Sequence, residues 1–180
     1  MRIAALIATL LLAACAGAPP RDRPPLPTVD LERFMGSWYV IANVPYFFER
    51  GKVATRDEYR LRPDGRIDND FVFRRGFDKP EQRWNGVSTV QPGSNGARWR
   101  VQFVWPFSTG LEVLELDPDY RWALLATPDR TLAWLFSREP DMDAASYEDL
   151  RARFARHGVE PAALQRVPQL PEQVGRPGFQ

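Results

Sequence analysis

The chain has 180 residues, 44% of them hydrophobic, which is enough for one domain with a buried core. Its 24 Lys and Arg residues nearly balance 23 Asp and Glu residues, leaving a net charge of +1. This balance argues against a polyelectrolyte partner, and against nucleic acid in particular.

An export signal comes first along the chain. A short positive start precedes an apolar run, Ile3–Leu12, which is followed by Ala13, Ala14 and the only cysteine, Cys15. The run is shorter than the roughly 20 apolar residues that a membrane-spanning helix needs. Residues 1–14 are therefore predicted to be a secretory signal peptide.

Cys15 is predicted to be a lipid attachment point. Leu12–Cys15 resembles the lipobox of bacterial lipoproteins, and this resemblance implies cleavage before Cys15 and acylation of both its sulfur and the new amino group. Ala16 follows, in place of the aspartate associated with inner-membrane retention. The resemblance thus implies a lipid anchor on the periplasmic face of the outer membrane. Residues 15–29, which hold five prolines, are predicted to be the lipidated N-terminus and a Pro-rich tether.

Residues 30–167 contain short apolar or alternating segments separated by turn residues. Arg62–Gly65 and Gln91–Gly96 are typical of these turns. Eight consecutive strands joined by short links predict an all-β fold, an eight-stranded antiparallel up-and-down barrel that can enclose one small ligand. The predicted strands are Ser37–Asn43, Val53–Leu61, Ile67–Arg75, Arg83–Val90, Ala97–Val104, Leu111–Leu116, Arg121–Thr127 and Leu132–Ser137.

Alternation within the strands predicts which residues face the interior. The same parity groups Ala42 with Val40 and Gly86 with Ser88, and these small residues are expected to leave space inside the barrel. Asp57 and Tyr59 also share parity and are expected to point inward, where a buried Asp would need a partner such as an Arg in an ion pair. The last three strands are nearly all apolar, so a period of two does not choose their inner face.

Helical segments flank the strands. Asp30 is predicted to cap a short helical turn, and residues 144–156 carry an apolar stripe that is predicted to pack on the outside of the barrel. His157, the only histidine, is expected at the surface at the end of this C-terminal helix. Ala163–Val167 is predicted to be a last short strand, and residues 168–180 a flexible tail.

Three motifs in the chain resemble those of the lipocalin family. Gly36–Tyr39 matches the G-x-W-Y motif, Asp119–Arg121 resembles the second motif with Pro118 in place of its usual Thr, and Arg138 matches the arginine of the third. Together, behind a lipobox, they are more specific than any one motif alone. The resemblance covers about Leu31 to Val167 and is greatest to the bacterial lipocalins.

The resemblance implies a role for each group of residues. Trp38 and Arg138 would close the barrel floor through a cation–π contact, and the opposite mouth would admit a fatty acid or lysophospholipid, stored or transported for membrane maintenance. No enzyme activity, cofactor or metal is expected. The residues expected to contact the ligand are Val40, Ala42, Tyr59, Trp84, Phe103, Trp105, Leu111, Val113 and Trp134.

Other interpretations remain open at this stage. A filled barrel would make the chain an interaction module, and a few proteins with this fold modify lipids. Tyr46–Phe48, three large apolar residues in a loop, suit a ligand entrance, a homodimer contact or a membrane contact. The basic residues near the predicted mouth suit an anionic headgroup or a charged membrane surface; they are Arg50, Lys52, Arg74, Arg75, Lys79 and Arg83.

Overall fold

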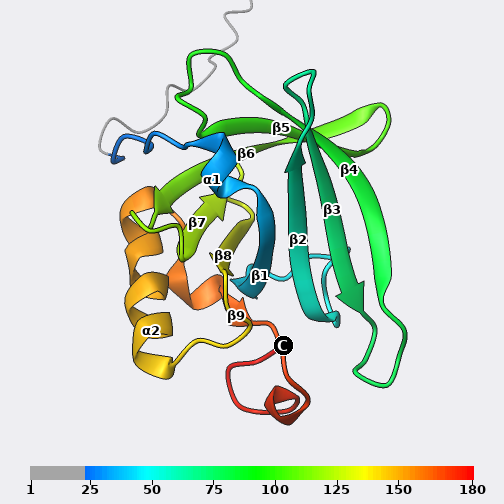
Figure 1. Cartoon of the computed structure of the whole chain (residues 1–180). Helices are drawn as coiled ribbons and strands as arrows, with labels where there is room; N and C mark the ends of the chain where they lie inside the picture. Colours follow the sequence, from blue (N-terminus) through cyan, green and yellow to red (C-terminus); the bar gives the residue numbers. More distant parts are fainter. Residues whose placement is uncertain (1–22) are drawn as a thin grey trace, which may run out of the picture.

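The structure is a computed structural model that describes residues 23–180, so the predicted signal peptide and Cys15 lie outside the described residues (Figure 1). Eight antiparallel strands form a closed ring in which each pairs with its neighbours in sequence and β1 also pairs with β8. This confirms the predicted up-and-down barrel. The strands are β1 (Gly36–Asn43), β2 (Val53–Leu61), β3 (Ile67–Arg74), β4 (Gln82–Val90), β5 (Arg98–Val104), β6 (Phe107–Leu116), β7 (Trp122–Ala126) and β8 (Ala133–Ser137).

A short helix, α1 (Leu31–Phe34), precedes the first strand of the barrel. The Asp30 side chain caps it by accepting hydrogen bonds from the backbone N–H groups of the first turn. Just before it, Val29 is buried and its backbone N–H donates to the carbonyl of Asn95 at 2.8 Å. The end of the predicted tether is therefore part of the folded domain.

Two hydrophobic clusters lie on opposite sides of the barrel wall. The inner cluster contains Val113 of β6, Leu125 of β7 and Phe136 of β8. The outer cluster lies between the wall and helix α2 (Ala144–Arg153) and includes Leu124 and Leu150. Helix α2 thus covers the outer face of β6, β7 and β8 (Figure 1), which explains why these strands are apolar on both sides.

A β-bulge in β1 overturns one prediction from alternation. The register with β8 shifts between Val40 and Ala42, because an extra residue there interrupts the pairing. Val40 belongs to the inner cluster, but Ala42 belongs to the outer cluster beneath α2. The prediction that Ala42 lines the interior with Val40 is wrong.

Helix α2 is continued by a 3-10 turn, Phe154–His157. His157 is 1% exposed and its Nε2 lies 2.7 Å from Oε1 of Glu115, so the expected surface position of this histidine is also wrong. Gly158 follows with a positive φ of 80° and ends the turn. Within residues 23–180, the helices are all too short or too polar to span a bilayer.

Several residues of the segment 168–180, predicted to be a flexible tail, pack against the barrel. Strands β1 and β2 stop pairing after Tyr39 and Arg56, which leaves the next carbonyls without a ladder partner. The buried side chain of Gln169 donates to the Val40 carbonyl at 2.7 Å and to the Thr55 carbonyl at 3.0 Å. The tail therefore closes a gap in the wall that the strand sequences do not reveal. The short strand β9 (Gln165–Arg166) pairs with β1 beside it.

Candidate functional site

The floor of the barrel is closed by stacked side chains. The Arg138 guanidinium lies 3.7 Å from the ring centroid of Trp38, which is fully buried. The Trp38 indole N–H donates to the Phe34 carbonyl at 2.8 Å, and the Phe34 ring packs against both Trp38 and Trp99. This end of the interior is filled by aromatic side chains, so any ligand must lie above it.

The loop between β1 and β2 crosses the opposite end of the barrel. Its Tyr46 ring lies edge-on to Trp134 of β8, with 6.4 Å between ring centroids, and its Phe48 ring lies 6.2 Å from Trp84 of β4. These contacts join opposite walls of the mouth. Residues 44–52 thus form a strap over the interior, which we call the mouth strap.

The mouth strap is held by a buried carboxyl group. Glu49 is 7% exposed, accepts a hydrogen bond from the Trp134 indole at 3.0 Å, and also accepts one from the Asn43 amide. Burial raises the pKa of the Glu49 carboxyl above its ordinary value, although the bonds from Asn43 and Trp134 act in the opposite direction. Desolvation, assisted by Glu49 and Asp57, likewise raises the pKa of Tyr46.

A buried lysine lies within the mouth. Lys52 is 5% exposed, donates to the Phe48 carbonyl, and has its Nζ 4.6 Å from the ring centroids of both Phe73 and Trp84. Burial and the nearby Arg75 lower the pKa of Lys52. A positive charge bordered by aromatic faces suits the boundary between an anionic headgroup and a hydrocarbon chain.

Several residues predicted to contact the ligand do face the interior. Trp84 packs on the rings of Phe71 and Phe73 from β3. The others, all in the inner cluster or packed against it, are Val40, Tyr59, Leu111, Val113 and Trp134. They line the part of the interior between the floor and the mouth strap.

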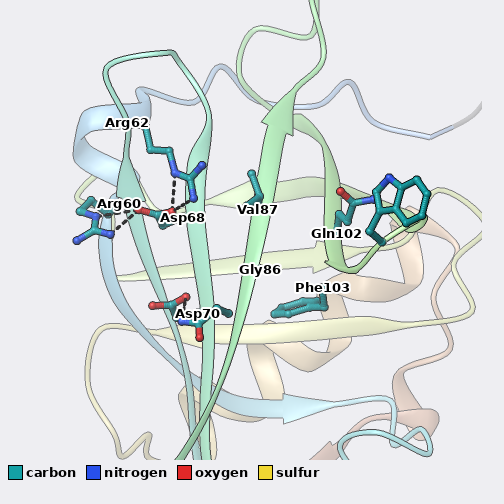
Figure 2. A pocket seen from close by; sticks show the side chains of 10 residues that line it. Arg60, Arg62, Asp68, Asp70, Gly86, Val87, Gln102 and Phe103 are labelled. Atoms are coloured by element: carbon teal, nitrogen blue, oxygen red, sulfur yellow. Dashed lines mark hydrogen bonds and ion pairs between the residues drawn. The ribbon is translucent and has the colours of Figure 1, made fainter.

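Two predicted ligand residues, Phe103 and Trp105, are exposed to solvent. The ladder between β4 and β5 ends at Val87 and Gln102, so the wall splits there. Phe103 fills the split beside Gly86 (Figure 2), where a Cβ atom on Gly86 would come within 2.8 Å of the ring. Gly86 therefore leaves no empty space, contrary to expectation. Trp105 is 83% exposed on the turn to β6 and does not line the interior.

The split borders a groove of about 420 Å³ on the outer surface. On its far side Asp68 pairs with Arg60 and Arg62 (Figure 2). Because polar and charged groups line this open groove, it does not suit a hydrocarbon chain. Among the described residues, no group of three His, Cys, Asp or Glu side chains is placed to hold a metal ion.

Comparison with known sequences decides the family. A lipocalin-like domain model matches residues 29–169. The outer membrane lipoprotein Blc of Citrobacter freundii is 33% identical over 162 residues, covering 88% of this chain and 90% of that protein. The chain belongs to the lipocalin family. Temperature-induced lipocalin-1 of Arabidopsis thaliana is 31% identical over 153 residues, covering 78% of this chain and 80% of the plant protein.

Solved lipocalin structures share the fold. Lobster apocrustacyanin A1 superposes with a TM-score of 0.61 at 17% identity, covering 85% of this chain and 94% of the other. Insecticyanin from the tobacco hornworm, Manduca sexta, has a TM-score of 0.61 at 20% identity, covering 81% of this chain and 84% of the other. Both comparisons support the closed antiparallel barrel.

Sequence reasoning missed the polar groups inside this lipocalin. Glu49 and Asn43 were not singled out, although a charged residue directly after three aromatic loop residues is a usable signal for a buried contact. Asn69 of β3 also faces inward, with its amide donating to the Ser88 hydroxyl at 3.2 Å. Its parity with Phe71 would have shown this orientation.

Proposed function

We propose that this lipocalin binds a long-chain fatty acid or a lysophospholipid inside the barrel, for storage or transport at the outer membrane to which Cys15 anchors it. The observation that carries the proposal is the aromatic mouth around the Lys52 ammonium, which Trp84 and Phe73 flank. An acyl chain would lie on the aromatic walls, with its anionic headgroup beside the ammonium. No catalytic step is assigned to the chain.

The energetics allow such binding. A sixteen-carbon chain has about fifteen methylene groups, and at ~0.8 kcal/mol each its burial supplies roughly 12 kcal/mol of transfer free energy. Association and ordering of the ligand cost several kcal/mol of that, and displacing the mouth strap costs more. Micromolar affinity remains within reach.

The anchor is supported by the lipobox resemblance of Leu12–Cys15 and by the name of the bacterial relatives, outer membrane lipoprotein. Fractionation of cells that express the full chain tests it. We expect to find the full chain in the outer-membrane fraction. Cys15→Ser should be absent from that fraction. An unchanged distribution of Cys15→Ser would exclude the anchor.

Native mass spectrometry of the delipidated protein tests the ligand. Titration with palmitate and with palmitoyl lysophosphatidylcholine should give a complex with one acyl ligand. Trp84→Ser should weaken binding at least tenfold, because Trp84 packs inside the mouth against Phe73. Trp105→Ser is the matched control, since that indole is 83% exposed and should have little effect. Failure to take up any acyl ligand would reject the proposal.

A second function has an observation in its favour. Phe47 is 85% exposed and Phe107 is 75% exposed, alongside Trp105, and such apolar surface is unusual for a monomer without a partner. The lipocalin would then act as an interaction module or form a homodimer. Sedimentation analysis of the purified protein, compared with Phe47→Ser and Phe107→Ser, would show whether these side chains mediate association.

A further inference from the structure

The hairpin of β5 and β6 ends in an exposed apolar segment. Residues 103–107 have the sequence Phe-Val-Trp-Pro-Phe, and we call them the hairpin tip. Trp105 is 83% exposed, Phe107 75% and Val104 65%. The turn between β5 and β6 projects from the barrel on the side away from α2 (Figure 1). Large apolar side chains that gather on the surface in this way mark a contact site.

The hairpin tip projects because the barrel wall divides beside it. The ladder between β4 and β5 ends at Val87 and Gln102, whereas β5 and β6 still pair at Val104 and Phe107. The two strands therefore leave the wall together as a two-stranded arm. Phe103 fills the split at the base of this arm (Figure 2). The other large side chains of the tip stay exposed.

The arm carries no charge near its tip. Residues 101–111 contain no Asp, Glu, Lys or Arg. The charged residue that precedes them, Arg100, is basic and exposed. The one that follows, Glu112, is 8% exposed, and Arg98 and Arg130 hold its carboxylate at 2.8 and 2.7 Å. The arm thus presents apolar side chains and a guanidinium to its surroundings, and no exposed carboxylate.

A lipid bilayer matches this arrangement. Aromatic side chains are favoured at the boundary between lipid headgroups and hydrocarbon, and an arm without charges enters that boundary without desolvating an ionised group. Arg100 lies on the outer face of β5, between the buried Trp99 and Val101. It is about 14 Å along the strand from Val104, so its long side chain can meet the phosphates of the surface that the tip enters.

A protein partner is a poorer match because the hairpin tip is small. A stable protein interface needs roughly 20–30 residues on each side, and the tip is the single short segment 103–107. A bilayer makes no such demand. Fluid lipid adapts to the shape of the tip, and each apolar side chain that it buries contributes to binding.

The predicted anchor makes a weak contact sufficient. Acylated Cys15 would precede Arg23, the first described residue, by eight positions, and eight residues span at most about 28 Å. The barrel is then held close to the bilayer, and the hairpin tip meets lipid at a high effective concentration. A few apolar side chains, too weak to bring a soluble protein to a membrane, can therefore orient an anchored one.

We propose that the hairpin tip is a membrane-docking element, which inserts into the headgroup region of the bilayer that anchors the lipoprotein and thereby orients the barrel on the surface that supplies or receives its lipid. The inference rests on the proposed function, an anchored lipid-binding lipocalin, and adds a second point of contact with the membrane. It assigns the exposed side chains of Trp105 and Phe107 to lipid and not to a second copy of the chain.

A fluorescent label on the hairpin tip tests the contact. Val104→Cys in the full-length acylated lipoprotein is labelled with the dye NBD, while acylation protects Cys15 from the reagent. The matched control is Val174→Cys, since Val174 is 56% exposed on the C-terminal segment, which is well separated from the turn between β5 and β6 in Figure 1. Each protein is reconstituted into vesicles of phosphatidylethanolamine and phosphatidylglycerol, with or without bromine on the acyl chains.

Brominated lipid should quench the label on Val104→Cys about threefold more than the label on Val174→Cys. Iodide in the aqueous phase should quench it less. Adding Trp105→Ser and Phe107→Ser to the labelled protein should reduce quenching by brominated lipid to the level of the control. Both side chains are exposed, so thermal unfolding and palmitate uptake should not change.

The other outcomes overturn the inference. A label on Val104→Cys that is shielded from iodide but is not quenched by brominated lipid lies against protein, and sedimentation of the same sample would then show a second copy. A label that iodide alone quenches lies in water. In both cases lipid binding stands if palmitate is taken up in the mass-spectrometry titration. If the lipoprotein without an added cysteine takes up the dye, Cys15 is not acylated, and the proposed anchor fails instead.

Discussion

The two ends of the barrel interior treat buried polar groups in opposite ways. At the floor, the Arg138 guanidinium has more carbonyl acceptors than it has nitrogens. Its acceptors are the carbonyls of Arg33, Phe34, Met35, Ser37 and Tyr120, at 2.8–3.3 Å. Higher in the barrel, the Thr55 hydroxyl, the Asp57 carboxyl and the Asn69 amide oxygen are buried and have no hydrogen-bond partner among residues 23–180. The floor is built for stability, and the wall above it carries groups that lower stability.

This contrast locates the functional part of the molecule. An unsatisfied buried polar group costs about 1–3 kcal/mol, and natural sequences accept such costs mainly at sites that serve function. Packing alone would favour apolar residues at these positions, as it does at Val113 and Leu125 on the opposite wall. The difference between the two ends can be tested by removing the Arg138 guanidinium at the floor and the unpaired Asp57 carboxyl on the wall above it.

The largest expected effect is at the floor. Arg138→Leu removes the hydrogen bonds to the α1 carbonyls and the stacking on Trp38, so the free energy of unfolding should fall by about 3 kcal/mol. Urea unfolding measures the change. Arg121→Leu is the control, because its side chain is 71% exposed and its pair with Asp117 should contribute little to stability. Equal effects of the two substitutions would contradict the assigned role of the floor.

The fold could be predicted from the sequence because turn chemistry and alternation mark most strands. The errors have local causes. The bulge at Val40 and Ala42 changes parity within one strand, and no residue type announces it. The packing of residues 168–180 depends on two carbonyls left free where β1 and β2 separate, which is a property of three-dimensional pairing. His157 is buried through its contact with Glu115, a residue distant in sequence.

The candidate site was harder to predict than the fold. Parity placed Asp57 and Tyr59 inside, and a family resemblance placed Trp38 and Arg138 at the floor, as the structure has them. The partners of the buried strap residue Glu49 could not be derived, because the path of a loop across a barrel depends on the contacts made at its tip. Trp105 and Trp84 are both tryptophans in predicted β segments. Alternation alone cannot distinguish a residue on an exposed turn from one that lines the mouth of the barrel.

The second prediction has the opposite sign from the first, because the substitution removes an unpaired buried group and should raise the free energy of unfolding. Asp57→Leu should raise the free energy of unfolding at pH 7 by about 1–2 kcal/mol, because a buried acid without partners is replaced by an apolar side chain. The folded-state pKa of Asp57 lies well above its ordinary value. The native protein therefore binds more protons than the unfolded chain between those two values, and its stability falls as pH rises.

The pH dependence makes this test specific. The stabilisation by Asp57→Leu should be smallest well below the ordinary pKa of aspartate, where Asp57 is protonated in both states, and should grow as pH rises. Chemical unfolding at several pH values measures it, with the outer-face substitution Asp70→Leu as control. A destabilised Asp57→Leu protein at every pH would mean that Asp57 has a partner in solution.

The third prediction concerns access to the interior. Glu49→Ala removes the acceptor that fastens the mouth strap to Asn43 and Trp134. The strap should open more often, so a fluorescent fatty acid should associate several times faster in stopped-flow measurements, and acrylamide should quench Trp134 fluorescence more strongly. Stability should change by less than about 1 kcal/mol, since a desolvation cost and favourable bonds are lost together. Glu139→Ala, on the exposed segment after β8, supplies the comparison, and equal association rates would show that the strap does not limit entry.

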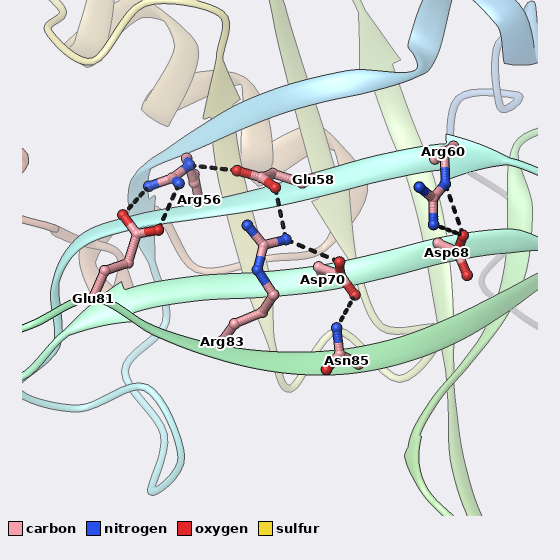
Figure 3. A network of polar contacts seen from close by, with 8 residues as sticks. All are labelled: Arg56, Glu58, Arg60, Asp68, Asp70, Glu81, Arg83 and Asn85. Atoms are coloured by element: carbon pink, nitrogen blue, oxygen red, sulfur yellow. Dashed lines mark hydrogen bonds and ion pairs between the residues drawn. The ribbon is translucent and has the colours of Figure 1, made fainter.

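The smallest effect is expected on the outside of the same strands. There, charges that alternate with the buried groups of the inner wall form a continuous network (Figure 3), in which Arg56 donates to Glu58 at 2.8 Å and to both oxygens of Glu81 at 2.9 and 3.0 Å. The hydrogen bonds from Arg56 lower the pKa of Glu81. Since the Glu81 side chain is 39% exposed, Glu81→Gln should cost only about 0.5 kcal/mol at pH 7 and low salt.

The sign of the pH dependence separates the two faces of the wall. The stabilisation by Glu81 is present above its ordinary pKa and is lost as pH falls through its lowered folded-state pKa, so the cost of Glu81→Gln should vanish at low pH and also in high salt. The effect of Asp57→Leu has the opposite sign and should resist salt, because Asp57 is buried. The carboxyl groups of Asp57 in β2 and Glu81 just before β4 would thus respond to pH in opposite directions, because Glu81 has an arginine partner and Asp57 is buried without one among the described residues.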